Sequence, residues 1–297
     1  MIVTIVGAGR LAEGIAVRAL AGGCTLRLAD AEPGKAEALA GLLDGRVEAV
    51  TDVAGLAGVL TGSDVVVLAL PYPQGRLVAA QQGAAMAGLT LIDTCNPVDF
   101  STFDALLTSP GMSAAEEIAR EVATVSPAAH VVKAFSTTFA ATLLTGQVAG
   151  LPLDVFLAGD DPAAKAKVAA LVRAGGMRPV DAGPLRRSRE LEGLQLLHMT
   201  LQGPLGLDWA SSVKLLPLHW QGGSHHPRLR SPRRGRTGRR FLPLSPAGGA
   251  RRLHRRPGEG LGPGAQDRRV GARGSHRRPP GPGGRQCGGP ARRLHRP

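Results

Sequence analysis

Residues 2–12 read IVTIVGAGRLA, and this stretch decides the fold. Residues 2–6 form a short run that is apolar except for Thr4 and does not alternate, the pattern expected of a strand that is covered on both faces. Two glycines, Gly7 and Gly9, follow at once, and an Ala-rich helical segment begins at Leu11. A strand, a glycine turn and a helix in this order predict the opening half of a βαβ unit.

The turn fits the pattern G-x-G-x-x-G/A, in which each small residue has its own physical task. Gly7 permits a tight turn, Gly9 lets the backbone approach a diphosphate, and Ala12 allows the helix to pack closely on the strand. The first helical turn, with Arg10 and Leu11, offers unpaired N–H groups and a positive dipole end to the phosphates. A match in this context predicts a dinucleotide site for NADP(H) or NAD(H).

Apolar runs alternate with Ala-rich segments as far as residue 182. We expect strands at 2–6, 25–29, 47–50, 64–70, 89–94 and 131–135, and helices at 11–21, 35–43, 74–87 and 114–122. A further strand, helix and strand are expected at 153–158, 162–174 and 179–181, before a helical stretch that Gly203-Pro204 should interrupt. The alternation predicts an α/β fold with a doubly wound parallel sheet of Rossmann type.

An acid ends the second predicted strand, 23 residues after Gly7. This residue, Asp30, has the spacing of the carboxylate that binds the adenine ribose hydroxyls. Its charge would repel a 2′-phosphate and favours NAD(H), whereas Lys35 and Arg10 lie near enough in sequence to neutralise a phosphate. An ordinary loop acid is the alternative interpretation of Asp30.

Two further strands end in short proline turns, Leu70-Pro71 and Asn96-Pro97. The carboxyl ends of parallel strands line the ligand crevice of a doubly wound sheet, so we expect both turns near the nicotinamide. The Asn96 amide can hydrogen-bond a carboxamide or a substrate carbonyl. Each of these residues could also serve only to form its turn.

The net charge of +13 is not spread evenly along the chain. Residues 1–216 contain 16 Lys and Arg against 21 Asp and Glu, whereas residues 217–297 contain 20 Arg against two acids, with 17 Gly and 12 Pro. We expect residues 218–297 to be a disordered tail, because they lack a sustained apolar pattern. The sudden change of composition also suggests a frameshifted or read-through end.

The cysteines and the apolar runs exclude several classes of protein. The three cysteines have neither metal-ligand nor disulfide spacing, and no metal site is expected. The apolar runs are too short to span a bilayer, and the start has no basic region typical of a secretory signal. We therefore expect a cytoplasmic protein without a membrane partner.

Two alternatives to an enzyme are a redox-sensing module that binds NAD(P) without turnover and a nucleic-acid binder that uses its Arg-rich tail. The tail has few aromatics, so no specific nucleic acid is expected.

Several longer motifs resemble a known family. They are residues 93–100 (DTCNPVDF), 131–142 (VVKAFSTTFAAT), 159–161 (GDD), 181–192 (DAGPLRRSRELE), 198–202 (HMTLQ) and 210–216 (ASSVKLL). Together they are similar to the NADPH-dependent coenzyme F420 reductases, relatives of the N-terminal domain of pyrroline-5-carboxylate reductases. The resemblance covers about residues 1–216, and relatives usually have small polar and basic residues where this chain has Ala29-Asp30.

This resemblance implies an NAD(P)-binding Rossmann domain over residues 1–150 and a small, mainly helical C-terminal domain over 151–217. It implies hydride transfer between nicotinamide and a deazaflavin, coenzyme F420, or another small redox co-substrate, with no catalytic side chain required. An imine or carbonyl reductase is a neighbouring alternative, and a homodimer is left open. The resemblance assigns two groups of residues: Gly7, Gly9, Arg10 and Leu11 to the diphosphate, and Leu70, Pro71, Asn96, Pro97, Lys133 and Ala134 to the nicotinamide.

Overall fold

The computed structural model describes residues 1–43 and 46–217, so the tail predicted for 218–297 lies outside the described residues. The strands are β1 (Ile2–Val6), β2 (Thr25–Asp30), β3 (Val47–Asp52), β4 (Val65–Leu68), β5 (Thr90–Asp93), β6 (His130–Lys133), β7 (Gln147–Val148), β8 (Leu151–Pro152), β9 (Asp154–Gly159) and β10 (Arg178–Gly183). The helices are α1 (Arg10–Ala21), α2 (Lys35–Leu42), α3 (Leu56–Leu60), α4 (Tyr72–Gln82), α5 (Ala114–Val125), α6 (Ala140–Thr145), α7 (Pro162–Ala174), α8 (Ser188–Thr200) and α9 (Gln202–Leu205). Three short 3₁₀ turns are η1 (Val53–Gly55), η2 (Gly83–Met86) and η3 (Leu185–Arg187).

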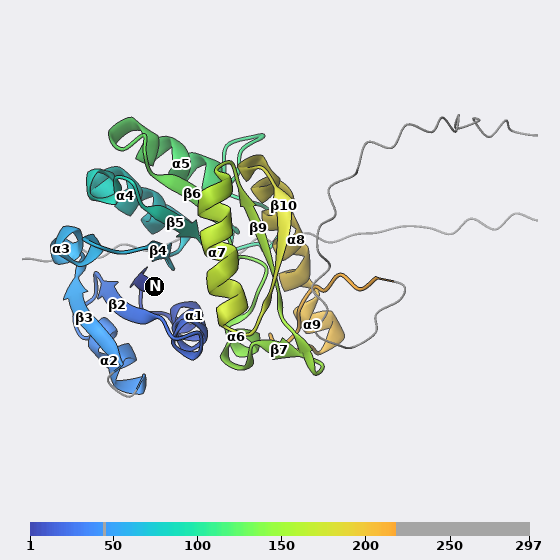
Figure 1. The fold of residues 1–297 in the computed structure, drawn as a ribbon. Helices are drawn as coiled ribbons and strands as arrows, with labels where there is room; N and C mark the ends of the chain where they lie inside the picture. Colours follow the sequence, from blue (N-terminus) through green and yellow to red (C-terminus); the bar gives the residue numbers. More distant parts are fainter. Residues whose placement is uncertain (44–45, 218–297) are drawn as a thin grey trace, which may run out of the picture. The chain divides into compact units, whose positions relative to one another are not determined.

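Eight of the strands form one sheet in the order β10-β9-β6-β5-β4-β1-β2-β3 (Figure 1). All neighbours in this sheet are parallel except β6 and β9. The chain runs from β1 outward to β3 and then returns to β4 on the other side of β1. The glycine turn after β1 therefore lies at the point where the strand order reverses, which is where ligands bind in open α/β sheets.

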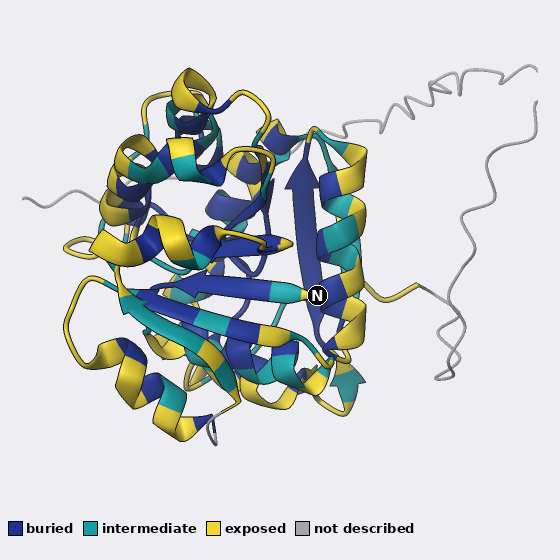
Figure 2. Cartoon of the chain, turned by 60° about the vertical axis from the view of Figure 1, so that its left-hand side comes forward, coloured by how far each residue is buried: buried dark blue, intermediate teal, exposed yellow. Residues whose placement is uncertain are grey.

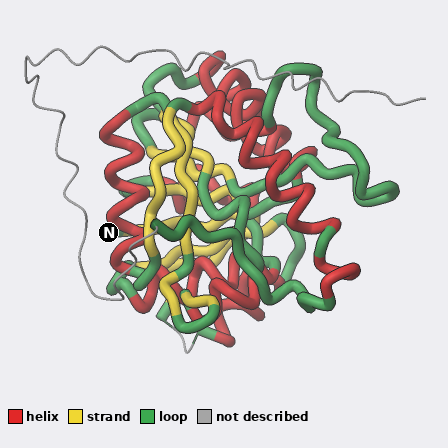
Figure 3. Tube along the Cα trace, turned by 90° about the vertical axis from the view of Figure 1, so that its right-hand side faces the viewer, coloured by secondary structure: helices red, strands yellow, loops and turns green. Residues whose placement is uncertain are grey.

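The central strands are buried on both faces, because successive side chains point to opposite sides. In β4, Val65 and Val67 face a core that includes Val168 of α7, whereas Val66 and Leu68 face a second core on the side of α4 and α5. Figure 2 shows the resulting pattern, with dark blue strands inside and yellow outer surfaces on the helices. Figure 3 shows the strands enclosed between helices. The predicted doubly wound α/β fold is confirmed.

Residues beyond 150 widen this sheet before the chain becomes helical. Strand β9 pairs with β6 in antiparallel register, and α7 connects β9 to the parallel strand β10. Helix α7 begins where the sequence predicts because Asp161 accepts a hydrogen bond from the Ala164 N–H at 2.6 Å. The expected boundary at residue 150 therefore separates two parts of one sheet, and residues 151–217 contain the strands β9 and β10 beside the helices α7, α8 and α9.

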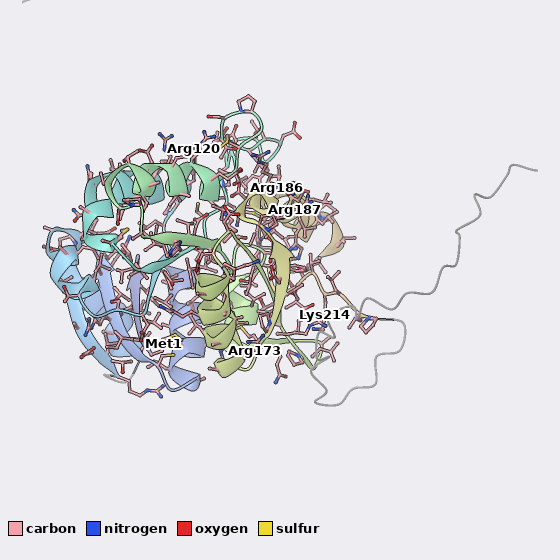
Figure 4. All side chains as sticks on the ribbon, turned by 45° about the horizontal axis from the view of Figure 1, so that its top comes forward. Met1, Arg120, Arg173, Arg186, Arg187 and Lys214 are labelled. Atoms are coloured by element: carbon pink, nitrogen blue, oxygen red, sulfur yellow. The ribbon has the colours of Figure 1, made fainter. Side chains whose placement is uncertain are left out.

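The last described segment is held by Asp154, the buried first residue of β9. Its carboxylate accepts hydrogen bonds from Lys214 Nζ at 2.6 Å and from the Leu215 N–H at 3.1 Å, and it pairs with Arg178. Lys214 is labelled in Figure 4. Burial alone would raise the pKa of Asp154, but the hydrogen bonds from Arg178 and Lys214 lower it further than burial raises it. The segment that ends near residue 216 is thus tied to the sheet.

Some local predictions fail where short-range signals are weak. Strand β6 stops at Lys133 and not at the predicted residue 135, because Phe135 takes a left-handed conformation with φ of 61°. The six-residue helix α6 and the two-residue strands β7 and β8 were not expected. Over the described residues, no helix combines the length and apolar character needed to cross a membrane.

Candidate functional site

The glycine turn is fixed by the strands on both sides of β1. Gly7 has φ of 103°, and its N–H donates to the carbonyl oxygen of Ala29 at 2.7 Å. A Cβ on Gly7 would lie 2.4 Å from the carbonyl oxygen of Ala69, at the end of β4. Both the conformation and the space therefore require glycine here. This residue forms the turn and is needed whether or not a ligand binds.

Gly9 has a different role, since nothing in the protein crowds it. It is the N-cap of α1 with ordinary extended backbone angles, φ −82° and ψ −179°, and no side chain caps the helix there. A Cβ at Gly9 would meet no heavy atom within 4 Å. The first hydrogen bond of α1 joins the Glu13 N–H to the Gly9 carbonyl, so the N–H groups of Arg10 and Leu11 have no acceptor within the helix. Open space beside unpaired donors suits a diphosphate.

The other residues of the motif differ in their burial. Ala12 is fully buried and packs with Val3 and Ile5 of β1, as predicted from the motif. Leu11 packs partly against the same core. Arg10 is exposed and its guanidinium has no partner within the described residues.

Asp30 points from the end of β2 toward the glycine turn. Its Oδ2 accepts a hydrogen bond from the Ala8 N–H at 2.7 Å, and its Oδ1 accepts one from the Glu32 N–H at 2.8 Å. The carboxylate is thereby fixed beside the turn, as the spacing predicts for a residue that binds ribose. Lys35 is drawn into an exposed ion pair with Glu32, whose hydrogen bond raises the pKa of the lysine.

The two proline turns meet at a pocket of about 280 Å³ at the carboxyl edge of the sheet. It is lined by Pro71, Tyr72, Pro73, Gln74, Asn96, Pro97, Val98, Phe100 and Leu107. Three of the residues expected near the nicotinamide, Pro71, Asn96 and Pro97, are therefore brought together. The half-buried Leu70 precedes Pro71 at the end of β4 and packs against the core on the α4 side.

Asn96 is oriented by one hydrogen bond and has a second polar atom without a partner among the described residues. Its Nδ2 donates to the carbonyl oxygen of Ser136 at 2.8 Å, while its Oδ1 is buried without a partner among the described residues. The hydroxyls of Ser136 and Thr137 are likewise buried and unpartnered in this part of the chain. Buried polar atoms are normally satisfied, so these groups fit the polar end of a bound molecule such as a carboxamide.

Lys133 does not face this crevice, which corrects the expectation that it contacts the nicotinamide. Its side chain is fully buried, and its Nζ binds Asp93 Oδ2 at 2.8 Å, Glu192 Oε1 at 2.7 Å and the Cys95 carbonyl oxygen. Three acceptors use all three of its protons. Ala134 is also fully buried, and its N–H donates to the Asp93 carbonyl oxygen, so neither its side chain nor its N–H can reach a ligand.

The Lys133 cluster joins α8 to the strand ends next to the pocket. Burial alone would lower the pKa of Lys133, but the charges of Asp93 and Glu192 raise it, and the ammonium stays charged. Burial raises the pKa of Glu192, and it raises that of the Cys95 thiol well above its ordinary value. Glu192 also accepts the Ala114 N–H at the start of α5. The cluster fixes the loop that carries Asn96, and its acids were not among the predicted residues.

A sequence signal for part of this cluster existed in the strand register. Asp93 and Lys133 end adjacent parallel strands and are direct register partners, so opposite charges at two buried strand ends could have been paired. Tyr72 and Phe100, which line the pocket, were also missed. Phe100 lies in the long loop between β5 and α5, which has no regular pattern, whereas Tyr72 begins α4 and contacts Glu117 of α5, which is distant in sequence.

The open space at Gly9, the unpaired donors of α1 and the unpartnered Asn96 Oδ1 together fit a dinucleotide along this edge. Comparison with known proteins agrees. Residues 2–97 match the family model described as "NADP oxidoreductase coenzyme F420-dependent".

Two solved structures are similar over most of the described chain. A protein from Arthrobacter sp. FB24, provisionally described as an F420-dependent NADP reductase, is 29% identical with a TM-score of 0.59, over 69% of this chain and 94% of that one. A hypothetical protein from Sinorhizobium meliloti is 29% identical with a TM-score of 0.54, over 62% of this chain and 86% of that one. The resemblance seen in the sequence is confirmed over residues 2–97, which are similar to the coenzyme F420-dependent NADP oxidoreductases.

Proposed function

We propose that this protein transfers hydride between a nicotinamide cofactor and a small acceptor held in the pocket beside Asn96. Coenzyme F420 is the acceptor that the family description favours. The observation that carries the proposal is the position of the pocket. It lies at the same sheet edge as the glycine turn, and its wall includes Asn96 with an unpartnered buried oxygen.

The residues of the chain would bind and orient the reactants. The turn at Gly9 would hold the diphosphate, and Asn96 Oδ1 would accept a hydrogen bond from the carboxamide N–H. Pro71, Pro97 and Val98 give the pocket a largely apolar wall that limits water around the reacting rings. A bound reduced nicotinamide supplies the two electrons and the hydrogen nucleus, so the protein contributes position and environment.

The pocket lacks a group that is ready to donate a proton. Among the described residues that line it, only Tyr72 is titratable, and its hydroxyl already donates to Glu117. Burial and the hydrogen bond to Glu117 raise the pKa of Tyr72, so it remains a neutral phenol whose proton is engaged by Glu117. An imine or carbonyl reductase needs a positioned acid, whereas a deazaflavin can take its proton from solvent. The pocket therefore favours a ring acceptor.

A turnover assay tests the proposal directly. The full chain is mixed with NADH or NADPH and oxidised coenzyme F420, and loss of the reduced nicotinamide absorbance is followed against a control without protein. We expect oxidation that depends on both the protein and the acceptor. Cofactor binding without oxidation, with F420 and with a panel of quinone and flavin acceptors, would contradict the proposal and support a redox-sensing module.

Asn96→Ala tests the orientation of the cofactor in the same assay. Loss of one hydrogen bond should raise the KM for the nicotinamide cofactor by roughly three- to tenfold. The control is Gln81→Ala on the exposed face of α4, outside the pocket. An unchanged KM in folded Asn96→Ala would remove this side chain from the site.

A further inference from the structure

The geometry around Asp30 indicates which nicotinamide cofactor this chain accepts. This inference rests on the proposed function. Asp30 is half-buried at the end of β2, and its two oxygens accept the N–H groups of Ala8 and Glu32. A carboxylate has about four acceptor positions, so each oxygen can still accept one more hydrogen bond. Vicinal hydroxyls of a ribose are donors that match two such oxygens.

The carboxylate cannot turn away from the turn without losing both bonds. The bond to Ala8 attaches it to the residue between Gly7 and Gly9, within the segment that would hold the diphosphate. A nucleotide bound through that turn places its adenine ribose at the end of the second strand. Any group on the ribose 2′-oxygen would therefore face a fixed negative charge.

The cations nearby do not cancel this charge. Lys35 is committed to Glu32, which adds a second carboxylate to the same loop. Arg10 is the remaining cation on the turn, and its guanidinium is exposed to solvent and unpartnered among the described residues. Solvent screens an exposed charge far more than a half-buried one. The electrostatic environment at this end of β2 is therefore determined mainly by the negative charge of Asp30.

We propose that this chain is selective for NAD(H), with Asp30 binding the ribose hydroxyls and excluding the 2′-phosphate of NADP(H). The description of the matching family names NADP, so the proposed selectivity of this chain differs from that description. Since placing like charges together is costly, NADH should bind at least about tenfold more tightly than NADPH.

Calorimetric titration of the full chain with NADH and with NADPH, without any acceptor, tests this selectivity. Asp30→Asn keeps an oxygen for the Ala8 N–H and removes only the charge, and Asp30→Ser also shortens the side chain. Both should bind NADPH more tightly and NADH more weakly than the unchanged protein. The matched control is Asp52→Asn, because Asp52 is the register partner of Asp30 on β3 and caps η1 through an oxygen that asparagine retains. Its preference should not change.

Each outcome decides between the two proposals. Tighter binding of NADPH than NADH by the unchanged protein would overturn the selectivity and leave the hydride-transfer proposal intact. Equal changes in both affinities in folded Asp30→Asn would show that Asp30 does not face the ribose. A further outcome is that the unchanged protein binds NADPH at least as tightly as NADH and that Arg10→Ala loses only NADPH binding. That result would assign the 2′-phosphate to Arg10. Failure to bind either cofactor would overturn both proposals.

Discussion

Replacing each glycine of the turn separates what the fold requires from what a ligand requires. In Gly7→Ala the new Cβ would lie 2.4 Å from the backbone oxygen of Ala69, at φ of 103°. In Gly9→Val the backbone already has extended angles that valine adopts readily, and its Cβ would meet no heavy atom within 4 Å. The first change disturbs the protein, and the second fills space that only a ligand would use.

Gly7→Ala should therefore lower mainly the stability of the protein, and Gly9→Val should lower mainly its affinity for the cofactor. Gly7→Ala combines strained backbone angles with a backbone clash, which together cost about 2–6 kcal/mol of the free energy of unfolding. That is a large share of the roughly 5–15 kcal/mol typical of a folded domain. Gly9→Val should cost about 1 kcal/mol, the preference of an N-cap for glycine over an aliphatic residue. Its branched methyl groups should weaken cofactor binding at least tenfold, or about 1.4 kcal/mol.

Urea unfolding measures the stability of each variant, and calorimetric titration with NADH measures the affinity of the folded Gly9→Val protein. The expected pattern is a large loss of stability in Gly7→Ala and a large loss of affinity in Gly9→Val. Unchanged affinity in folded Gly9→Val would refute the assignment of this turn to the diphosphate. A Gly7→Ala protein as stable as the unchanged chain would refute the geometry of the turn itself.

Two further changes test the buried ion pairs. Lys133→Met leaves two buried carboxylates without their cation and should lower the free energy of unfolding, measured by urea titration, by about 3–5 kcal/mol. Lys35→Met breaks only an exposed pair and should lower the same free energy by less than about 1 kcal/mol. Equal losses would contradict the burial of the cluster. A chain ending at Pro217 should keep its melting temperature and its NADH affinity, because Lys214 still binds Asp154, while a chain ending just before Lys214 should melt lower. Loss of NADH binding on truncation at Pro217 would show that the tail takes part in the site.

The parts of the fold that the sequence predicts well are those set by local chemistry. The first strand has the predicted bounds because a run buried on both faces is apolar at nearly every position, and Thr4 is its one polar residue. Helix α7 also has the predicted bounds, since Asp161 caps its start, Pro162 is its first residue and Gly175 follows its end. The element α6 was missed because it has only six residues and no such boundary signals beyond Gly146.

The same distinction explains the candidate site. The roles of Gly7 and Gly9 could be predicted because both depend on the backbone and on the space that a missing side chain leaves. The presence of glycine in the sequence is itself the signal for such a role. Lys133 could not be placed in this way, since a lysine at the end of a strand can face either the crevice or the interior. The pairing with Asp93 follows from the strand register, but the second acid, Glu192, is 59 residues away in sequence and enters the cluster because α8 packs beside α5. A motif thus identifies the part of a site that its own residues build, and the side chains that depend on distant packing are found only in the folded chain.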